Sequence, residues 1–158
     1  MIAIALDALS LIPIPSSAGM ERTTLRARID CVITMYQHSA RLVTGKEFVY
    51  ISPVTIAELK YGAEIAEDPN VRQKRLVALR RLQRKPRLCI DEITGEIFGG
   101  LSAQLRAMGR TVRYRVQDLW LASLAVQHGF KLLTHNEGDF KDIPGLDLVI
   151  WRQAAGLD

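Results

Sequence analysis

The chain has 158 residues, of which 48% are apolar and 24% charged, a balance typical of a globular domain large enough to bury a hydrophobic core. No apolar run reaches the roughly 20 residues of a membrane-spanning helix, so we expect no membrane-embedded segment. The net charge of +4 and the sequence pI of about 9.3 give a mild indication of a polyanionic partner such as a nucleic acid.

The first predicted element is a buried strand at residues 2–6, a short and partly β-branched apolar run. The opening sequence, MIAIALDALSLIPIP, has the length and apolar character of a secretory signal peptide. However, it lacks a basic start, Asp7 interrupts it, and Pro13 and Pro15 break it. We therefore interpret the opening run as part of the fold.

The next predicted elements are a helix at about residues 23–42 and a buried strand at residues 48–51 (FVYI). Pro53 suits the first turn of the helix that follows this strand. An Asp-Pro-Asn sequence at residues 68–70 then breaks the chain. Leucines at helical spacing after the break predict another helix, which ends near Pro86.

The second half of the chain continues this alternation of strands and helices. Strands are predicted at residues 88–90, 131–133 and 146–150, and helices at residues 93–108, stopped by Gly109, and 118–127, stopped by Gly129. A basic loop at residues 110–116 separates the two helices. The pattern predicts an α/β fold: one three-layer α/β/α domain over residues 1–158 with a mostly parallel central sheet.

The two cysteines, Cys31 and Cys89, lie far apart and have no spacing typical of a metal site. Each has apolar neighbours, so both are predicted to be reduced residues of the core. Reduced cysteines favour a cytoplasmic protein.

Four acidic residues are predicted to meet at one edge of the sheet, because functional groups gather at the carboxyl ends of parallel strands. They are Asp7 at the end of the first strand, Glu58 one turn into the helix after the second, Asp118 at a helix start, and Asp139 just past the strand at residues 131–133. Three of them also have ordinary structural interpretations. Asp118 could be a helix N-cap, Glu58 part of a solvated helix face, and Asp139 a turn residue.

Asp7 is harder to explain structurally, because a carboxylate between Leu6 and Ala8 is costly to bury without a partner. Carboxylates about 4 Å apart repel each other by about 1 kcal/mol per pair even in water, so four together require a counter-charge. An all-oxygen site suits Mg²⁺ or Mn²⁺, ions that assist phosphodiester cleavage. The histidines, His38, His128 and His135, are scattered, and we interpret His135 as a bystander.

Four segments of the chain resemble PIN-domain ribonucleases, and in particular the VapC-like toxins of bacterial type II toxin–antitoxin pairs. They are ISPVTIAELKYG (51–62), LSAQLRAMGR (101–110), QDLWLASLAVQHGFKLLTHNEGDF (117–140) and IPGLDLVIW (143–151). The resemblance covers residues 48–151 well and the first strand weakly. It implies a compact α/β/α domain that is a Mg²⁺-dependent endoribonuclease.

The resemblance implies an acidic quartet at Asp7, Glu58, Asp118 and Asp139 that is catalytic and binds the metal. Asn136 and Thr134 match the T-x-N-x-x-D pattern of residues that support such a site. The partners implied are an RNA substrate, a second copy of the chain in a homodimer, and an antitoxin protein whose tail covers the acidic pocket.

The chain departs from the family pattern after the first acid, where Ala8 and Leu9 replace the usual hydroxyl residue and amide. This change motivates an alternative: a catalytically weakened PIN-like domain that binds RNA or protein. A third possibility is an α/β phosphatase or DNA nuclease that uses the same carboxylate chemistry.

Two basic segments could contact a polyanion. The loop before Asp118 carries the predicted substrate-binding residues Arg110, Arg113, Tyr114 and Arg115, whose arginines can bind phosphates and whose tyrosine can stack on an unpaired base. A solvated loop and an antitoxin contact are the alternatives. The segment at residues 72–87 is interpreted as a solvated helix face, with an RNA or antitoxin surface as its alternative.

Overall fold

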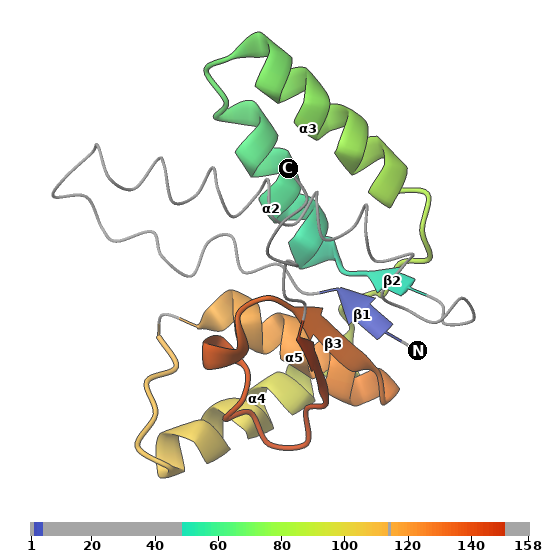
Figure 1. Cartoon of the computed structure of the whole chain (residues 1–158). Helices are drawn as coiled ribbons and strands as arrows, with labels where there is room; N and C mark the ends of the chain where they lie inside the picture. Colours follow the sequence, from blue (N-terminus) through green and yellow to red (C-terminus); the bar gives the residue numbers. More distant parts are fainter. Residues whose placement is uncertain (1, 5–48, 114, 151–158) are drawn as a thin grey trace, which may run out of the picture.

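The computed structural model describes residues 2–4, 49–113 and 115–150, with residues 2–4 described at the level of the backbone. Figure 1 shows the order of the elements along the chain. They are β1 (Ile2–Ile4), β2 (Val49–Ile51), α2 (Pro53–Glu64), α3 (Pro69–Leu82), α4 (Glu92–Ala107), α5 (Val116–His128), β3 (Lys131–Thr134), the 3-10 turn η1 (Glu137–Asp139) and β4 (Leu148–Ile150).

The strands of the described residues form a four-stranded sheet in the order β2-β1-β3-β4, and each neighbouring pair is parallel. In the register of the sheet, Ile4 of β1 lies opposite Ile51 of β2 and Leu133 of β3. Helices α2 and α3 pack together, as do α4 and α5, and Figure 1 draws the two pairs on opposite sides of the strands. The predicted three-layer α/β fold with a parallel sheet is confirmed, and its extent as one domain over residues 1–158 stays a prediction.

Helix α2 begins where the sequence predicted, because Pro53 occupies its first position and Ser52 caps it. The Ser52 hydroxyl accepts a hydrogen bond from the Thr55 N–H at 3.0 Å. The buried face of α2 includes Thr55, Leu59 and, as its one acidic member, Glu58. The cap therefore fixes the start of a helix that turns a carboxylate inward.

Helix α3 is capped by Asp68, whose carboxylate accepts a hydrogen bond from the Asn70 N–H at 2.8 Å. Leu79 and Leu82 are buried, and so is Arg75. The guanidinium of Arg75 donates a hydrogen bond of 2.9 Å to the carbonyl oxygen of Gly62. This contact ties α3 to the last turns of α2.

Helices α4 and α5 are joined at one end by a polar cluster and along their length by the core. Asp91 caps α4 and forms a capping box with Thr94, and the side-chain amide of Gln127 on α5 donates to the Asp91 carboxylate at 3.0 and 3.1 Å. The buried apolar cluster lies between α4, α5, β3 and the segment after η1. It includes Leu88, Leu101, Leu105, Leu119, Leu121, Leu124, Phe130, Leu132, Phe140 and Ile143.

The predicted strand at residues 88–90 is wrong. Among the described residues, the chain there makes only an isolated parallel bridge between Arg87 and Ile51. Leu88 is buried, but Cys89 and Ile90 are exposed, so the segment has no apolar face to bury before Asp91 starts α4. The prediction that Cys89 belongs to the core is wrong for the same reason, although its thiol is free as expected.

Several predictions fall on residues that the structure does not describe. The predicted helix at residues 23–42, Asp7, Cys31 and His38 lie outside the described residues. Within residues 2–4, 49–113 and 115–150, none of the helices combines the length and apolar character needed to cross a membrane.

Candidate active site

Two of the four predicted acidic residues are buried on helices that contact each other. Glu58 on α2 is 2% exposed and Asp118 on α5 is 1% exposed, and α2 packs against α5. The interpretation of Glu58 as part of a solvated helix face is therefore wrong. Because a carboxylate is costly to remove from water, burying two of them is typical of a functional site rather than of a plain core.

The interpretation of Asp118 as a helix N-cap is also wrong. Helix α5 begins at Val116 with Arg115 as its N-cap, so Asp118 is the third helical residue, and the Arg115 side chain makes no capping hydrogen bond among the described residues. A carboxylate in the first helical turn is favoured by the positive end of the helix dipole. The neighbouring Leu119 is fully buried, which places this turn of the helix against the core.

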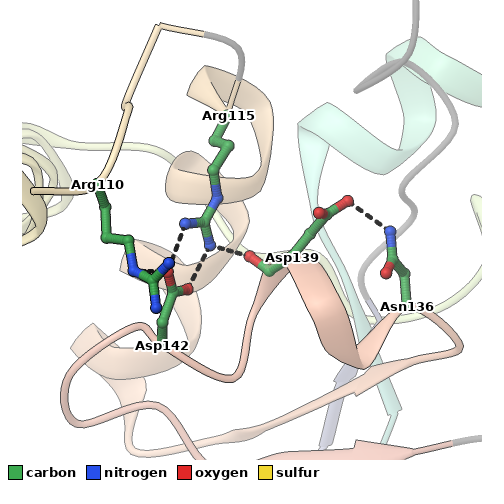
Figure 2. Close-up of polar contacts among 5 residues, drawn as sticks. All are labelled: Arg110, Arg115, Asn136, Asp139 and Asp142. Atoms are coloured by element: carbon green, nitrogen blue, oxygen red, sulfur yellow. Dashed lines mark hydrogen bonds and ion pairs between the residues drawn. The ribbon is translucent and has the colours of Figure 1, made fainter.

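Asp139 lies just beyond the carboxyl end of β3, in the turn η1, and is half-buried. Its carboxylate accepts a hydrogen bond from the side-chain amide of Asn136, as Figure 2 shows. The Asn136 N–H in turn donates to the hydroxyl of the buried Thr134 at 3.1 Å. The T-x-N-x-x-D pattern is thus a connected turn in which Asn136 orients Asp139.

Asp142, which the sequence reasoning did not single out, lies at the centre of a set of ionic contacts (Figure 2). Its carboxylate accepts two hydrogen bonds from the Arg115 guanidinium, at 2.9 and 2.7 Å. Arg115 also donates to the backbone carbonyl of Asp139, and the Nε atom of Arg110 lies 3.5 Å from Asp142. No local sequence pattern could have indicated the pair, because Arg115 and Asp142 are 27 residues apart.

The charges around Arg115 connect this ion pair to the predicted acids. The hydrogen bonds that Arg115 donates to Asp142 raise the pKa of Arg115, and the negative charges of Asp118 and Asp139 raise it further. Conversely, the hydrogen bonds from Arg115 lower the pKa of Asp142. Arg115 therefore lies within electrostatic reach of both Asp118 and Asp139.

The donor chemistry of the described carboxylates fits a hard divalent cation. Glu58, Asp118 and Asp139 offer only oxygen ligands, which Mg²⁺ and Mn²⁺ prefer. Among the described residues, no three or more His, Cys, Asp or Glu side chains form a cluster that could hold a metal ion. The fourth predicted ligand, Asp7, lies outside these residues, so the complete quartet stays a prediction.

The predicted substrate-binding residues differ in how they are held. The Arg115 side chain is only 14% exposed and is bound to Asp142, whereas that of Arg110 is 60% exposed. Arg113 is exposed, and Tyr114 lies outside the described residues. Arg110 and Arg113 are therefore accessible to a polyanion, while Arg115 is engaged within the protein.

The second basic segment is largely a solvated face, as interpreted from the sequence. Lys74, Arg80, Arg81 and Arg84 are exposed, and Arg72 pairs with Glu64 of α2. Arg75 is the buried exception.

Comparison with known proteins gives similar results by sequence and by structure. The sequence model of the PIN domain matches residues 35–146. The chain is 33% identical over 99 residues to Ribonuclease VapC4 of Mycobacterium tuberculosis, covering 63% of this chain and 74% of the relative. It is 30% identical over 92 residues to Ribonuclease VapC5 of the same organism, covering 58% and 66%.

Two solved structures illustrate the similarity of fold. The chain aligns with one in the crystal structure of VapBC2 from Rickettsia felis bound to a promoter DNA fragment, with a TM-score of 0.69, 24% identity and coverage of 96% and 100%. The toxin–antitoxin structure VapBC-5 from Mycobacterium tuberculosis aligns with a TM-score of 0.59, 25% identity and coverage of 65% and 82%.

Proposed function

Because the chain belongs to the PIN-domain family, we propose that it is a metal-dependent endoribonuclease and the toxin of a type II toxin–antitoxin pair. The observation that supports this most is the burial of two carboxylates, Glu58 and Asp118, on helices in contact, with Asp118 and Asp139 both acting on Arg115. The names of the relatives, Ribonuclease VapC4 and VapC5, support RNA as the substrate class.

We assign Mg²⁺ or Mn²⁺ to Asp7, Glu58, Asp118 and Asp139. When bound, such an ion supplies Lewis-acid stabilisation of the phosphate charge and makes water a better nucleophile. Glu58 and Asp118 place their carboxylates away from bulk solvent, where electrostatic interactions are strong. Asn136 holds the Asp139 carboxylate in orientation.

The RNA is proposed to bind along the loop between α4 and α5. Arg110 and Arg113 are exposed and can donate charge-assisted hydrogen bonds to backbone phosphates. Tyr114 lies in the sequence between these arginines and Asp118. We propose that it stacks on an unpaired base, the usual way in which proteins hold single-stranded RNA. This loop leads directly into the first turn of α5, so bound phosphates would lie next to the acidic residues.

The proposed partners are supported by the solved structure of VapBC-5, which is named as a member of the VapBC family of toxin–antitoxin systems. We propose that an antitoxin silences this chain by covering the acidic pocket, and that two copies of the chain form a homodimer. A cytoplasmic location follows from an RNA substrate and from the free thiol of Cys89.

The first prediction concerns the charge of Asp118. The substitution Asp118→Asn keeps the size of the side chain and removes its charge, so RNA cleavage in Mg²⁺ should fall by about 100-fold or more, the cost of losing one preorganised electrostatic group. The measurement is the initial rate of cleavage of a single-stranded RNA by the purified chain. Asp147→Asn, at an exposed aspartate, is the matched control and should cleave at the wild-type rate.

Cleavage by Asp118→Asn at the wild-type rate would contradict the assignment of the site. The same assay on DNA and on phosphomonoesters tests the phosphatase and DNA-nuclease alternatives, which predict faster hydrolysis of those substrates than of RNA.

The second candidate function is a PIN-like binding module without catalysis, which Ala8 and Leu9 after Asp7 favour. It predicts that calorimetry detects no heat of Mn²⁺ binding to the wild-type chain. Saturable Mn²⁺ binding together with RNA cleavage would exclude this module.

A further inference from the structure

The ion pair between Arg115 and Asp142 connects the two stretches of chain that carry Asp118 and Asp139. Arg115 is the N-cap of α5 and precedes Asp118 by one helical turn. Its guanidinium binds both the Asp142 carboxylate, at 2.9 and 2.7 Å, and the backbone carbonyl of Asp139. We propose that Arg115 and Asp142 are positioning residues that fix Asp139 relative to Asp118. The functional meaning of this inference rests on the proposed metal-dependent nuclease.

The geometry of the contact suits a positioning role. A guanidinium presents its N–H groups in a rigid plane, so a two-point contact with a carboxylate fixes direction as well as distance. In a third contact, the same guanidinium donates a hydrogen bond to the backbone carbonyl of Asp139, so it also fixes the backbone of the residue that we propose it positions (Figure 2). The side chains of Arg115 and Asp142 are 14% and 18% exposed, so water and salt screen the pair less than a fully exposed one.

The pairing with Asp142 also removes an electrostatic conflict. Arg115 lies within reach of the charges of Asp118 and Asp139, and a lone cation there would compete with a metal ion for them. Asp142 supplies the compensating negative charge, so the pair can hold the two acids in place with little net charge of its own. The role of Arg115 predicted from the sequence, binding of the substrate, is thus reassigned to positioning.

Two single substitutions separate positioning from simple electrostatics, because they change the local charge in opposite directions. Arg115→Gln removes a positive charge, and Asp142→Asn removes a negative one. If charge alone mattered, the first would tighten and the second would weaken the binding of a cation. If the pair positions Asp139, both should weaken Mn²⁺ binding by about 10-fold or more, as loss of an outer-shell partner typically does.

The experiment is a calorimetric titration of the full chain with Mn²⁺ alone. Because the two residues act as one unit, the double variant should bind Mn²⁺ about as weakly as either single variant. Arg115→Lys keeps the charge but not the planar fork and should also bind more weakly than wild type. Arg106→Gln, at an exposed arginine of α4, makes the same charge change as Arg115→Gln and should leave the affinity unchanged.

A second readout does not depend on the metal. In metal-free protein, both Arg115→Gln and Asp142→Asn should speed amide hydrogen exchange at residues 136–143, where the Phe140 and Lys141 N–H groups bond to the Glu137 carbonyl. If wild type binds no Mn²⁺, the proposed function is wrong, and hydrogen exchange alone decides whether the pair positions this segment.

Three results would overturn the inference. One is a shift of Mn²⁺ affinity in opposite directions in the two variants. Another is unchanged exchange at residues 136–143. The third is a lower melting temperature in both variants with Mn²⁺ affinity as in wild type, since that would make the pair a contributor to stability only.

Discussion

At the scale of single residues, burial decides between the interpretations that the sequence allows for the acidic residues. The sequence predicts Glu58 and Asp118 as site residues but also allows a solvated helix face for Glu58 and a helix N-cap for Asp118. A local pattern reports neither the burial of Glu58 nor the start of α5, which exclude these two alternatives. In the fold, Glu58 shares a face of α2 with Leu59, and Asp118 precedes the fully buried Leu119. A side chain's depth depends on elements remote in sequence, which is why the structure was needed to decide.

Asp142 provides a prediction for the pH dependence of stability. Its pKa lies below the ordinary value because Arg115 donates hydrogen bonds to it. A carboxyl whose pKa is lower in the folded than in the unfolded protein stabilises the fold above its unfolded pKa. This contribution is lost as the pH falls through the folded pKa.

Wild type should therefore be more stable than Asp142→Asn at neutral pH, by about 1.5–3 kcal/mol for hydrogen bonds that involve a charged group, and the difference should shrink in acid. The free energy of unfolding in urea, measured at a series of pH values, checks this. A difference that is constant or grows on acidification would show that the ion pair does not set the pKa of Asp142.

At the scale of elements, the sequence predicted those helices whose ends have local chemistry. Pro53 begins α2, Gly109 follows α4 with φ at 72°, and Gly129 ends α5 with φ at 62°, a conformation that favours glycine. The predicted strand at residues 88–90 failed because three apolar residues in a row do not reveal which of them will find a partner. Within the part of the chain that the structure describes, Leu88 does so, through its N–H to the carbonyl of Ile51 at 2.9 Å.

The ionic contacts that join elements could not be predicted, because each links residues distant in sequence. Arg75 lies among leucines at helical spacing, a pattern that marks an apolar face but not an inward arginine. The same holds for Arg115 and Asp142. In the sequence each has the pattern of an ordinary solvated charge, and the two meet only when α5 packs near the segment after η1.

The contact between α3 and α2 gives a prediction at this scale. Arg75→Met preserves most of the apolar stem but leaves the buried Gly62 carbonyl without its donor, so the free energy of unfolding should fall by about 1–3 kcal/mol. Chemical denaturation measures the change. Arg80→Met, at an exposed arginine of the same helix, should change stability by less than about 0.5 kcal/mol. Equal losses in the two variants would mean that the Gly62 contact contributes nothing specific.

At the scale of the whole molecule, the proposed site draws on stretches of chain that are far apart in the sequence. Glu58 comes from α2, Asp118 from α5 and Asp139 from the turn after β3, with Asp7 predicted to complete the set. Because an unfolded chain does not hold these carboxylates together, an ion bound by them stabilises the native state.

Mg²⁺ at 100 times its dissociation constant should therefore raise the free energy of unfolding by about 2.7 kcal/mol relative to protein in EDTA. The comparison is made by urea unfolding with and without the ion. Asp118→Asn should abolish the increase, and an equal increase in wild type and Asp118→Asn would place the ion elsewhere.

The most direct measurement is a crystal structure of the wild-type chain with Mn²⁺, in which anomalous scattering locates the ion. We predict an ion bonded to carboxylate oxygens of Asp7, Glu58, Asp118 and Asp139, directly or through water. An ion bound at saturating Mn²⁺ to other residues, or these four carboxylates lying on separate surfaces, would contradict it.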